Sequence, residues 1–239
     1  MIRASIASAV LVVAVMAAVP AAAQLRVEKR AVLMQPVVLG PNQAAIIVGF
    51  RRPDSMSAGK SGTLAFARYD PAVRDMIALP RDAKKRGDTA TYWVSVRSGD
   101  RKLALDHAVM VVSAGDYVLY GATPGPDGMV ANSFCLGAPT FHVGAGEAVY
   151  FGDVTPYIGV KLADGTTASA MAWSSHPDDA RAALVGQPGL VAAFHPASIR
   201  NNATYSCAAQ TMTAYAVPGA PALPPLSDAE KAVLFAPSP

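Results

Sequence analysis

Residues 141–150 read FHVGAGEAVY, an alternating apolar stretch that is interrupted by a short Gly-Ala-Gly segment. Alternation with a period of two is typical of a half-buried strand, and a Gly-rich break between two such segments is typical of a β-hairpin. With a two-residue loop at 145–146, side chains on either side pair across the hairpin. The predicted core face holds Phe141, Val143, Ala148 and Tyr150, and the opposite face holds His142, Glu147, Val149 and Phe151. A shift of one residue in the loop would exchange the two faces.

Short extended segments of the same kind lie on both sides of this hairpin. Turn-forming residues recur between them every eight to twelve positions, which is typical of all-β sandwiches and barrels. Residues 89–96 (TATYWVSV) give a strong strand signal, because β-branched and aromatic residues dominate them. The other predicted strands are residues 44–50, 63–69, 103–113, 116–120, 133–136, 140–143, 148–151, 190–194 and 204–217. The pattern therefore predicts a mainly β protein.

One or two short helices are expected beside these strands. Ser175 or His176 can cap a helix whose first turn suits Pro177, and the two aspartates that follow complement the positive end of its dipole. A Gly-Gln-Pro-Gly sequence then ends this helix at residue 186. Residues 71–79 carry a weaker helical pattern of one or two turns.

The N-terminus has the pattern of an export signal. Arg3 supplies a positive start, residues 4–19 are apolar apart from two serines, and Pro20 precedes three alanines. Small residues at this place suit a signal peptidase that cleaves before Gln24. The alternative is a retained anchor, but the apolar run is shorter than the ~20 residues that a spanning helix needs. We therefore expect a signal peptide at 1–23, a periplasmic or secreted protein, and no membrane span after cleavage.

Composition divides the mature chain into two parts. Residues 24–217 contain the strand pattern and are expected to form one β-sandwich domain. Residues 218–239 are rich in proline, which favours an extended arm. A capping box at 227–230 and the apolar residues that follow it predict that this arm ends in a brief amphipathic turn that packs back on the domain. The alternative is a disordered tail.

The chain has two cysteines, Cys135 and Cys207. An exported protein meets an oxidising compartment, and an even number of cysteines permits a single bridge. We therefore predict a disulfide between them, which would contribute roughly 4.4 kcal/mol by closing a long loop. The alternative is a pair of buried free thiols. Neither cysteine lies in a C-x-x-C motif, so a redox-catalytic role is not indicated.

Two motifs resemble a pattern found in uncharacterised bacterial exported proteins. Residues 115–119 read GDYVL and residues 141–153 read FHVGAGEAVYFGD, which is similar to a G-x-Y-x-L…F-x-V-x-A-G-E-x-x-Y-x-G-D signature. The resemblance covers about 40 residues and is a packing signature. It implies an antiparallel β-sandwich, immunoglobulin-like or transthyretin-like, located in the cell envelope. It carries no catalytic residue.

Three polar residues are the candidates for chemistry. His142 and Glu147 lie on one predicted face of the hairpin, and Asp153 follows it, so these residues could do acid–base work or pair as carboxylates in a hydrolase. The competing interpretation is a solvated polar face and carboxylates that stabilise turns. The four histidines show no H-x-H or H-E-x-x-H spacing, so no metal site is predicted. No G-x-S-x-G elbow occurs, and no cofactor is expected.

Composition narrows the classes of partner. Hydrophobic residues make up 52% of the chain and the formal net charge is only +3, so a polyelectrolyte surface for nucleic acid is absent. These observations favour a non-catalytic exported protein with a binding or structural role in the bacterial cell envelope. Its expected partner is an envelope protein or a glycan, and an exposed edge strand could receive a partner strand. The alternative function is a hydrolase with an active site built from loops.

Overall fold

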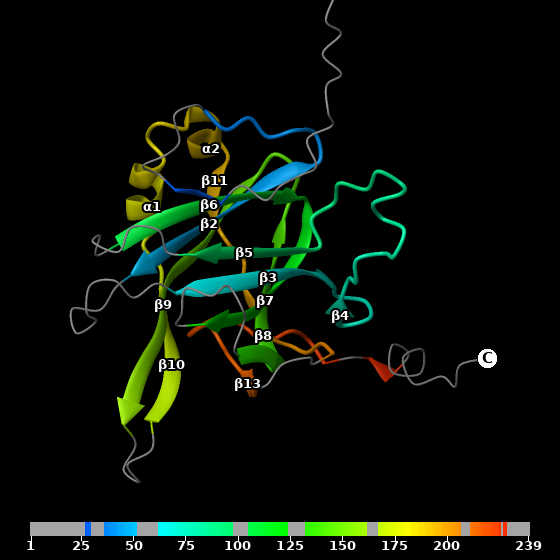
Figure 1. Cartoon of the computed structure of the whole chain (residues 1–239). Coiled ribbons are helices and arrows are strands. Elements are labelled where there is room, and N and C mark those ends of the chain that lie inside the picture. Colours follow the sequence, from blue (N-terminus) through cyan, green and yellow to red (C-terminus); the bar gives the residue numbers. More distant parts are fainter. Residues whose placement is uncertain are drawn as a thin grey trace, which may run out of the picture.

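The computed structural model describes residues 27–29, 36–51, 62–97, 105–123, 132–161, 167–206, 211–225 and 227–228. These residues are mainly β, with two short helices, which confirms the predicted fold class at this level. The strands form two sheets (Figure 1). Residues of both sheets contribute to one hydrophobic core, as the alternating pattern of the sequence requires.

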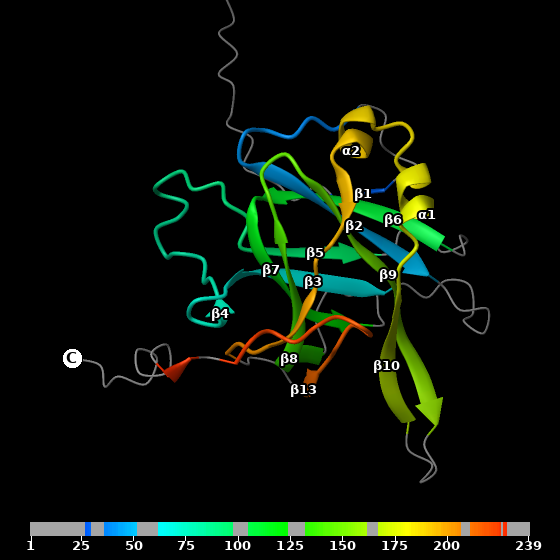
Figure 2. The same cartoon turned by 180° about the vertical axis from the view of Figure 1, so that it is seen from behind.

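Sheet A has the strand order β1-β6-β2-β9-β10, and β11 also pairs with β9. Its strands are β1 (Val27–Lys29), β2 (Gln43–Arg51), β6 (Leu105–Ser113), β9 (Ala148–Lys161), β10 (Thr167–Ser174) and β11 (Phe194–Pro196). Both β2 and β11 run parallel to β9, and the other pairs are antiparallel. The far ends of β9 and β10 project from the body as a two-stranded ribbon (Figures 1 and 2).

Sheet B has the strand order β12-β8-β7-β3-β4, with β13 beside β8 and β5 beside β3. Its strands are β3 (Thr63–Asp70), β4 (Asp75–Met76), β5 (Trp93–Arg97), β7 (Gly115–Thr123), β8 (Asn132–Val143), β12 (Arg200–Ala203) and β13 (Thr211–Ala214). The β13–β8 pair is parallel. The expectation of purely antiparallel sheets is therefore corrected, because long connections bring β2, β11 and β13 to their partners in the parallel direction.

The main core lies between the two sheets. Phe66 of β3 contacts Phe151 of β9 edge to face, with ring centroids 5.3 Å apart. Each fully buried side chain of this size stabilises the fold by about 1.5–3 kcal/mol. From β2 the residues in this core are Ala44, Ile46, Val48 and Phe50. Its intervening residues Ala45 and Ile47 are buried on the opposite face, which explains why β2 reads as a continuous apolar run.

Helices α1 (Pro177–Ala183) and α2 (Pro188–Ala192) cover that opposite face of sheet A (Figures 1 and 2). They bury Ala180, Leu184 and Leu190 against the sheet. The predicted helix after His176 is confirmed, with His176 at the N-cap position. The predicted strand at 190–194 is wrong. Pro188 starts a second helix instead, because its fixed φ suits the first helical position, and strand β11 begins only at Phe194.

The predicted hairpin at 141–150 is also wrong. Strand β8 ends at Val143 in sheet B and β9 begins at Ala148 in sheet A, so the two strands do not pair. The connection is bound to the start of β2 instead, through hydrogen bonds from Ala45 N to Glu147 O and from Gly146 N to Gln43 O. These bonds direct the second strand into the other sheet. Phe141 and Phe151 therefore meet across the core, with ring centroids 5.3 Å apart.

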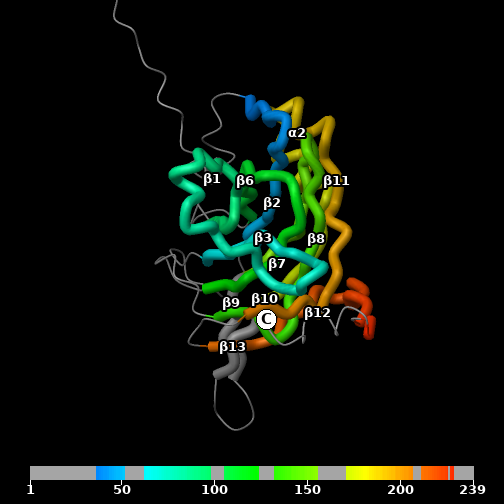
Figure 3. Tube along the Cα trace, turned by 90° about the vertical axis from the view of Figure 1, so that its right-hand side faces the viewer, coloured from blue at the N-terminus to red at the C-terminus, as the bar shows by residue number. Residues whose placement is uncertain are grey.

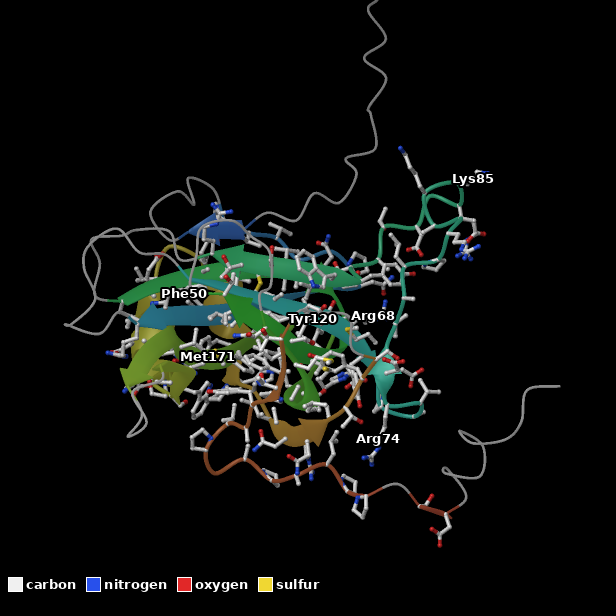
Figure 4. All side chains as sticks on the ribbon, turned by 60° about the horizontal axis from the view of Figure 1, so that its bottom comes forward. Phe50, Arg68, Arg74, Lys85, Tyr120 and Met171 are labelled. Carbon is white, nitrogen blue, oxygen red and sulfur yellow. The ribbon has the colours of Figure 1, made fainter. Side chains whose placement is uncertain are left out.

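Other segments differ from prediction in length. Residues 71–79 form a turn and the short β4 rather than a helix, and the two strands predicted at 133–136 and 140–143 are one strand, β8. Among the described residues of 204–217, which are 204–206 and 211–217, the strand is limited to β13. The basic loop 81–88 is exposed almost throughout, as expected, and carries Lys85 at its outer end (Figure 4).

Several predictions fall on parts of the chain outside the described residues. They concern the signal peptide at 1–23, Cys207 and the apolar end of the arm at 232–235. Cys135 is buried on β8 and is not a free thiol, but its pairing with Cys207 stays a prediction. None of the helices in the described ranges has the length and apolar character needed to cross a bilayer.

Candidate functional site

The carboxylate of Asp153 is the centre of a polar cluster on the helix-covered face of sheet A. Its side chain has 0% exposure. Oδ2 lies 2.8 Å from Arg51 Nη2 and 2.8 Å from His176 Nδ1, and Oδ1 accepts a hydrogen bond of 2.6 Å from the Tyr150 hydroxyl. His107 Nε2 lies 3.7 Å from Oδ1. We call these five residues the Asp153 cluster. A buried carboxylate is tolerated only with such partners.

A β-bulge brings Asp153 to this face. The register of β9 against β2 runs from Ile47 opposite Tyr150 to Val48 opposite Gly152, so β9 contains one extra residue. Without it, strict alternation would direct Asp153 to the face opposite Tyr150. With it, both side chains lie on the same face and their polar ends meet. A bulge that re-aims a side chain in this way is common next to functional sites.

Two glycines make the space that the cluster needs. A Cβ on Gly49 of β2 would lie 2.0 Å from Asp153 Oδ1, and one on Gly152 would lie 2.2 Å from Trp173 Nε1. Gly152 also has a φ of 135°, which other residues rarely adopt. The absence of side chains at these positions therefore lets Asp153 and the Trp173 indole lie close against the sheet.

The hydrogen bonds of Tyr150 fix where its hydroxyl proton lies. The Tyr150 hydroxyl accepts from the backbone amide of His176 at 3.2 Å and donates its own proton to Asp153. Burial, and then this bond to Asp153, raise the pKa of Tyr150 well above its usual range, so the phenol stays protonated. His176 Nδ1 lies 2.8 Å from Asp153 Oδ2 and 3.1 Å from Arg51 Nη2, so it donates to Asp153 in one tautomer and accepts from Arg51 in the other. In the tautomer with the proton on Nδ1, Nε2 is the acceptor available to a ligand.

A nucleophilic site needs a nucleophile, a base and a group that orients the base. This arrangement supplies the base, His176, and the orienting carboxylate, Asp153. A carboxylate that orients an imidazole is the base unit of many hydrolases. The His176 side chain is 43% exposed, so its outer edge is open to solvent. The Ser174 hydroxyl lies 3.5 Å from Nδ1, the nitrogen that already contacts Asp153, and is therefore misplaced as a nucleophile. The described residues contain no group of three or more His, Cys, Asp or Glu side chains placed to hold a metal ion.

The three residues singled out from the sequence are not brought together. Asp153 is in the cluster, but His142 lies on β8 of the other sheet, where its Nδ1 is 3.0 Å from Asp116 Oδ1. Glu147 lies in the β8–β9 connection, accepts from the Gly144 amide at 2.6 Å and has His195 Nε2 at 3.4 Å. The hairpin across which His142 and Glu147 were expected to pair does not form, although His142 still helps to lower the pKa of Glu147.

Sequence reasoning missed the partners of Asp153. Arg51, His107 and His176 come from three separate elements, and nothing in their local sequence connects them. The Y-x-G-D spacing at 150–153 was the one available signal. It places a glycine where a bulge would bring the tyrosine and the aspartate to the same face.

A pocket of about 350 Å³ lies next to Trp173 of β10, and it borders the Asp153 cluster because Tyr150 and Ser175 are in its lining. Its size falls within the range of ordinary small-molecule sites. The Trp173 indole donates a hydrogen bond of 3.1 Å to Phe151 O, which fixes the ring against β9. Besides Tyr150, whose hydroxyl bonds to Asp153, the polar side chains of the lining are Ser175, Ser198 and Arg200, and its proline residues are Pro196, Pro218 and Pro221. We call it the Trp173 pocket.

The outer wall of this pocket is the start of the C-terminal arm, which is held by Asn201. The buried Asn201 side chain donates to Val217 O and Ala220 O and accepts from Val217 N, all at 2.9 Å. Its backbone donates to Pro221 O and accepts from Leu223 N. Figure 3 shows the arm beside β12. Arg74 Nη2 adds a hydrogen bond to Pro224 O (Figure 4). The wall is therefore a fixed part of the fold.

A second depression, of about 530 Å³, lies between α1 and α2. Its walls are mainly aliphatic, and the Arg181 guanidinium beside it stacks over the Phe194 ring at 4.9 Å. Ligand sites usually combine apolar walls with several convergent polar groups. The Trp173 pocket meets that description better than this depression does.

Comparison of the chain with protein-family models, curated proteins and solved structures gave no match. The site is therefore interpreted from its own geometry.

Proposed function

We propose that this protein is exported to the bacterial cell envelope and acts there as a non-catalytic binding protein with a glycan ligand in the Trp173 pocket. The single observation that supports this function is a pocket of about 350 Å³ that combines one fixed indole with three polar side chains. An aromatic ring packs against the C–H face of a sugar, while hydroxyl and guanidinium groups bond to its oxygens.

The export signal and the sandwich architecture are consistent with this role. A protein that binds envelope glycan needs delivery across the inner membrane, which residues 1–23 would provide. We further propose that the sandwich is a variant of the immunoglobulin-like or transthyretin-like type that the sequence resembles, with parallel pairs added at β2, β11 and β13. N-terminal sequencing by mass spectrometry should find Gln24 as the first residue of the mature protein, whereas recovery of Met1 would contradict cleavage.

Binding can be tested by calorimetric titration of the full mature chain with soluble peptidoglycan fragments and neutral glucan oligomers. We expect at least one of these to bind and Trp173→Ala to weaken it at least tenfold, because the indole forms a wall of the pocket. Trp93→Ala is the matched control, since Trp93 is the only other tryptophan and lies 45% exposed on β5 of sheet B. Absence of binding to every probe, or equal effects of the two variants, would overturn the proposal.

The Asp153 cluster favours a second candidate function, a hydrolase in which His176 Nε2 takes a proton from an attacking water. The observation behind it is the 2.8 Å contact that holds Nδ1 against a fully buried carboxylate. A screen with ester, peptide and glycan substrates tests it. Any activity found should be lost in His176→Ala and in Asp153→Asn, and kept in His142→Ala, which changes an exposed residue of the other sheet. Equal activity in all variants would refute it.

A further inference from the structure

Arg200 is the only charged residue among the described residues that line the Trp173 pocket. The others are aromatic, aliphatic, proline, glycine or serine residues, so no carboxylate in that lining balances the guanidinium. Arg200 is exposed at the start of β12, where it lies opposite Thr140 of β8. The pocket therefore carries a net positive charge at one side.

The Arg200 side chain also has no ion pair or hydrogen bond within the described parts of the chain. Arg51, Arg68, Arg74 and Arg86, by contrast, each bond to a carboxylate or a carbonyl oxygen. A guanidinium that is not held by a partner of its own chain keeps all five of its N–H donors for a ligand.

A planar guanidinium matches a carboxylate with two parallel hydrogen bonds, which are shorter and stronger than bonds between neutral groups. The same lining offers an indole and two serine hydroxyls for the rest of a sugar. We propose that the Trp173 pocket selects acidic sugars and that Arg200 binds their carboxylate. This inference rests on the proposed glycan-binding function and specifies the ligand class of that same site.

The test compares an oligomer of galacturonic acid with the galactose oligomer of the same length, because the two differ in the carboxylate. For the wild-type chain at low salt we expect about tenfold tighter binding of the acidic oligomer, in line with the strength of a charge-assisted hydrogen bond. Arg200→Gln should remove this preference by weakening the binding of the acidic oligomer about tenfold more than the binding of the neutral oligomer. The preference should also shrink as sodium chloride is added.

Arg97→Gln is the matched control, since Arg97 is an exposed arginine at the end of β5 and outside the pocket lining. It should keep the acidic preference. Equal binding of both oligomers by the wild type, or a preference that survives in Arg200→Gln, would overturn the inference and leave the glycan-binding function standing. Binding of neither oligomer would overturn the inference, and the function would then depend on the peptidoglycan and glucan titrations.

Discussion

Gly152 is the residue on which both sites depend. Its φ of 135° belongs to the bulge that turns Asp153 toward Tyr150, and its missing side chain leaves room for the Trp173 indole. One position therefore sets the geometry of the Asp153 cluster on one face of β9 and the position of the indole on the other. A side chain here would conflict with both requirements at once.

We predict that Gly152→Ala lowers the free energy of unfolding by about 2–6 kcal/mol, because backbone strain and overpacking each cost about 1–3 kcal/mol. Urea denaturation measures the change. Gly186→Ala is the control, since a Cβ at Gly186 has no neighbour within 4 Å, and it should change stability by no more than about 0.5 kcal/mol. Equal effects of the two substitutions would contradict this account of the bulge.

Glu147 gives a prediction about pH. The Gly144 amide, which donates to this carboxylate, lowers the pKa of Glu147, and His195 lowers it further. Because the folded pKa lies below the unfolded one, the ionised carboxylate favours the folded state above the unfolded pKa, and this contribution is lost as pH falls through the folded pKa. The side chain is 41% exposed, so solvent screens the effect.

We therefore expect Glu147→Gln to lower the free energy of unfolding by at most about 1 kcal/mol at pH 7, with the difference disappearing below about pH 4. Chemical denaturation at a series of pH values measures it. A difference that grows as the solution is acidified would have the wrong sign for a carboxyl whose pKa is lowered on folding.

The sequence indicated Asp153 as a candidate site residue but did not indicate its partners in the Asp153 cluster, and the reason is physical. Asp153 directly follows a glycine, which follows an aromatic residue, so the local sequence itself contains the signal of a bulge. Arg51 and His176 reach it from β2 and from the start of α1. Such contacts depend on how three elements pack, and alternation along a single strand carries no information about them.

The connection between β8 and β9 shows that a local sequence pattern also fails to predict how two strands are placed relative to each other. Its alternating residues correctly predicted two strands, and Gly-Ala-Gly correctly predicted a turn between them. Whether the strands pair or separate depends on what else binds the turn, and here the backbone of β2 binds it. Both outcomes bury alternate residues, so the pattern alone does not distinguish a hairpin from a crossing between sheets.

The arm at 217–223 gives a prediction at the level of an element. We expect Asn201→Ala to release it, because three side-chain hydrogen bonds are lost and two carbonyl oxygens lose their donor. The free energy of unfolding should fall by about 2–4 kcal/mol. Hydrogen exchange should accelerate at the amides of Val217 and Leu223, and glycan binding should weaken because the pocket loses its outer wall.

Thr211→Ala is the control for this substitution, since Thr211 is exposed on β13. It should leave exchange at Val217 and Leu223 unchanged. Protection of both amides in Asn201→Ala would show that other contacts hold the arm.

For the whole molecule, the predicted disulfide would join β8 in sheet B to the segment before β13. We expect a peptide map of the non-reduced protein to contain the Cys135–Cys207 cross-link. Replacing both cysteines with alanine should lower the free energy of unfolding by about 2–4 kcal/mol, because the unfolded chain regains the freedom of a long loop. Two thiols that react with a titrant in the unfolded, non-reduced protein would contradict the bridge.

The alternating pattern of the whole chain predicted the mainly β class, because extended segments with a period of two dominate it. The sequence also predicted α1, but it placed a strand at 190–194, where α2 ends. These helices are short, and the second begins within the Gly-Gln-Pro-Gly sequence that ends the first. The packing of Leu184 and Leu190 on sheet A stabilises them, and burial of this kind outweighs the weak helical signal of such short segments.

The parallel pairing of β2 with β9 has a consequence for the order of assembly. Ala45 lies beside Ala148 in sheet A, so β2 meets this neighbour only after most of the chain has emerged. Until then its apolar edge is open to water and to other chains, and contacts so distant in sequence form slowly. If the chain is exported as proposed, its central sheet would still be incomplete during passage, and a holding chaperone would be most useful to it during that interval.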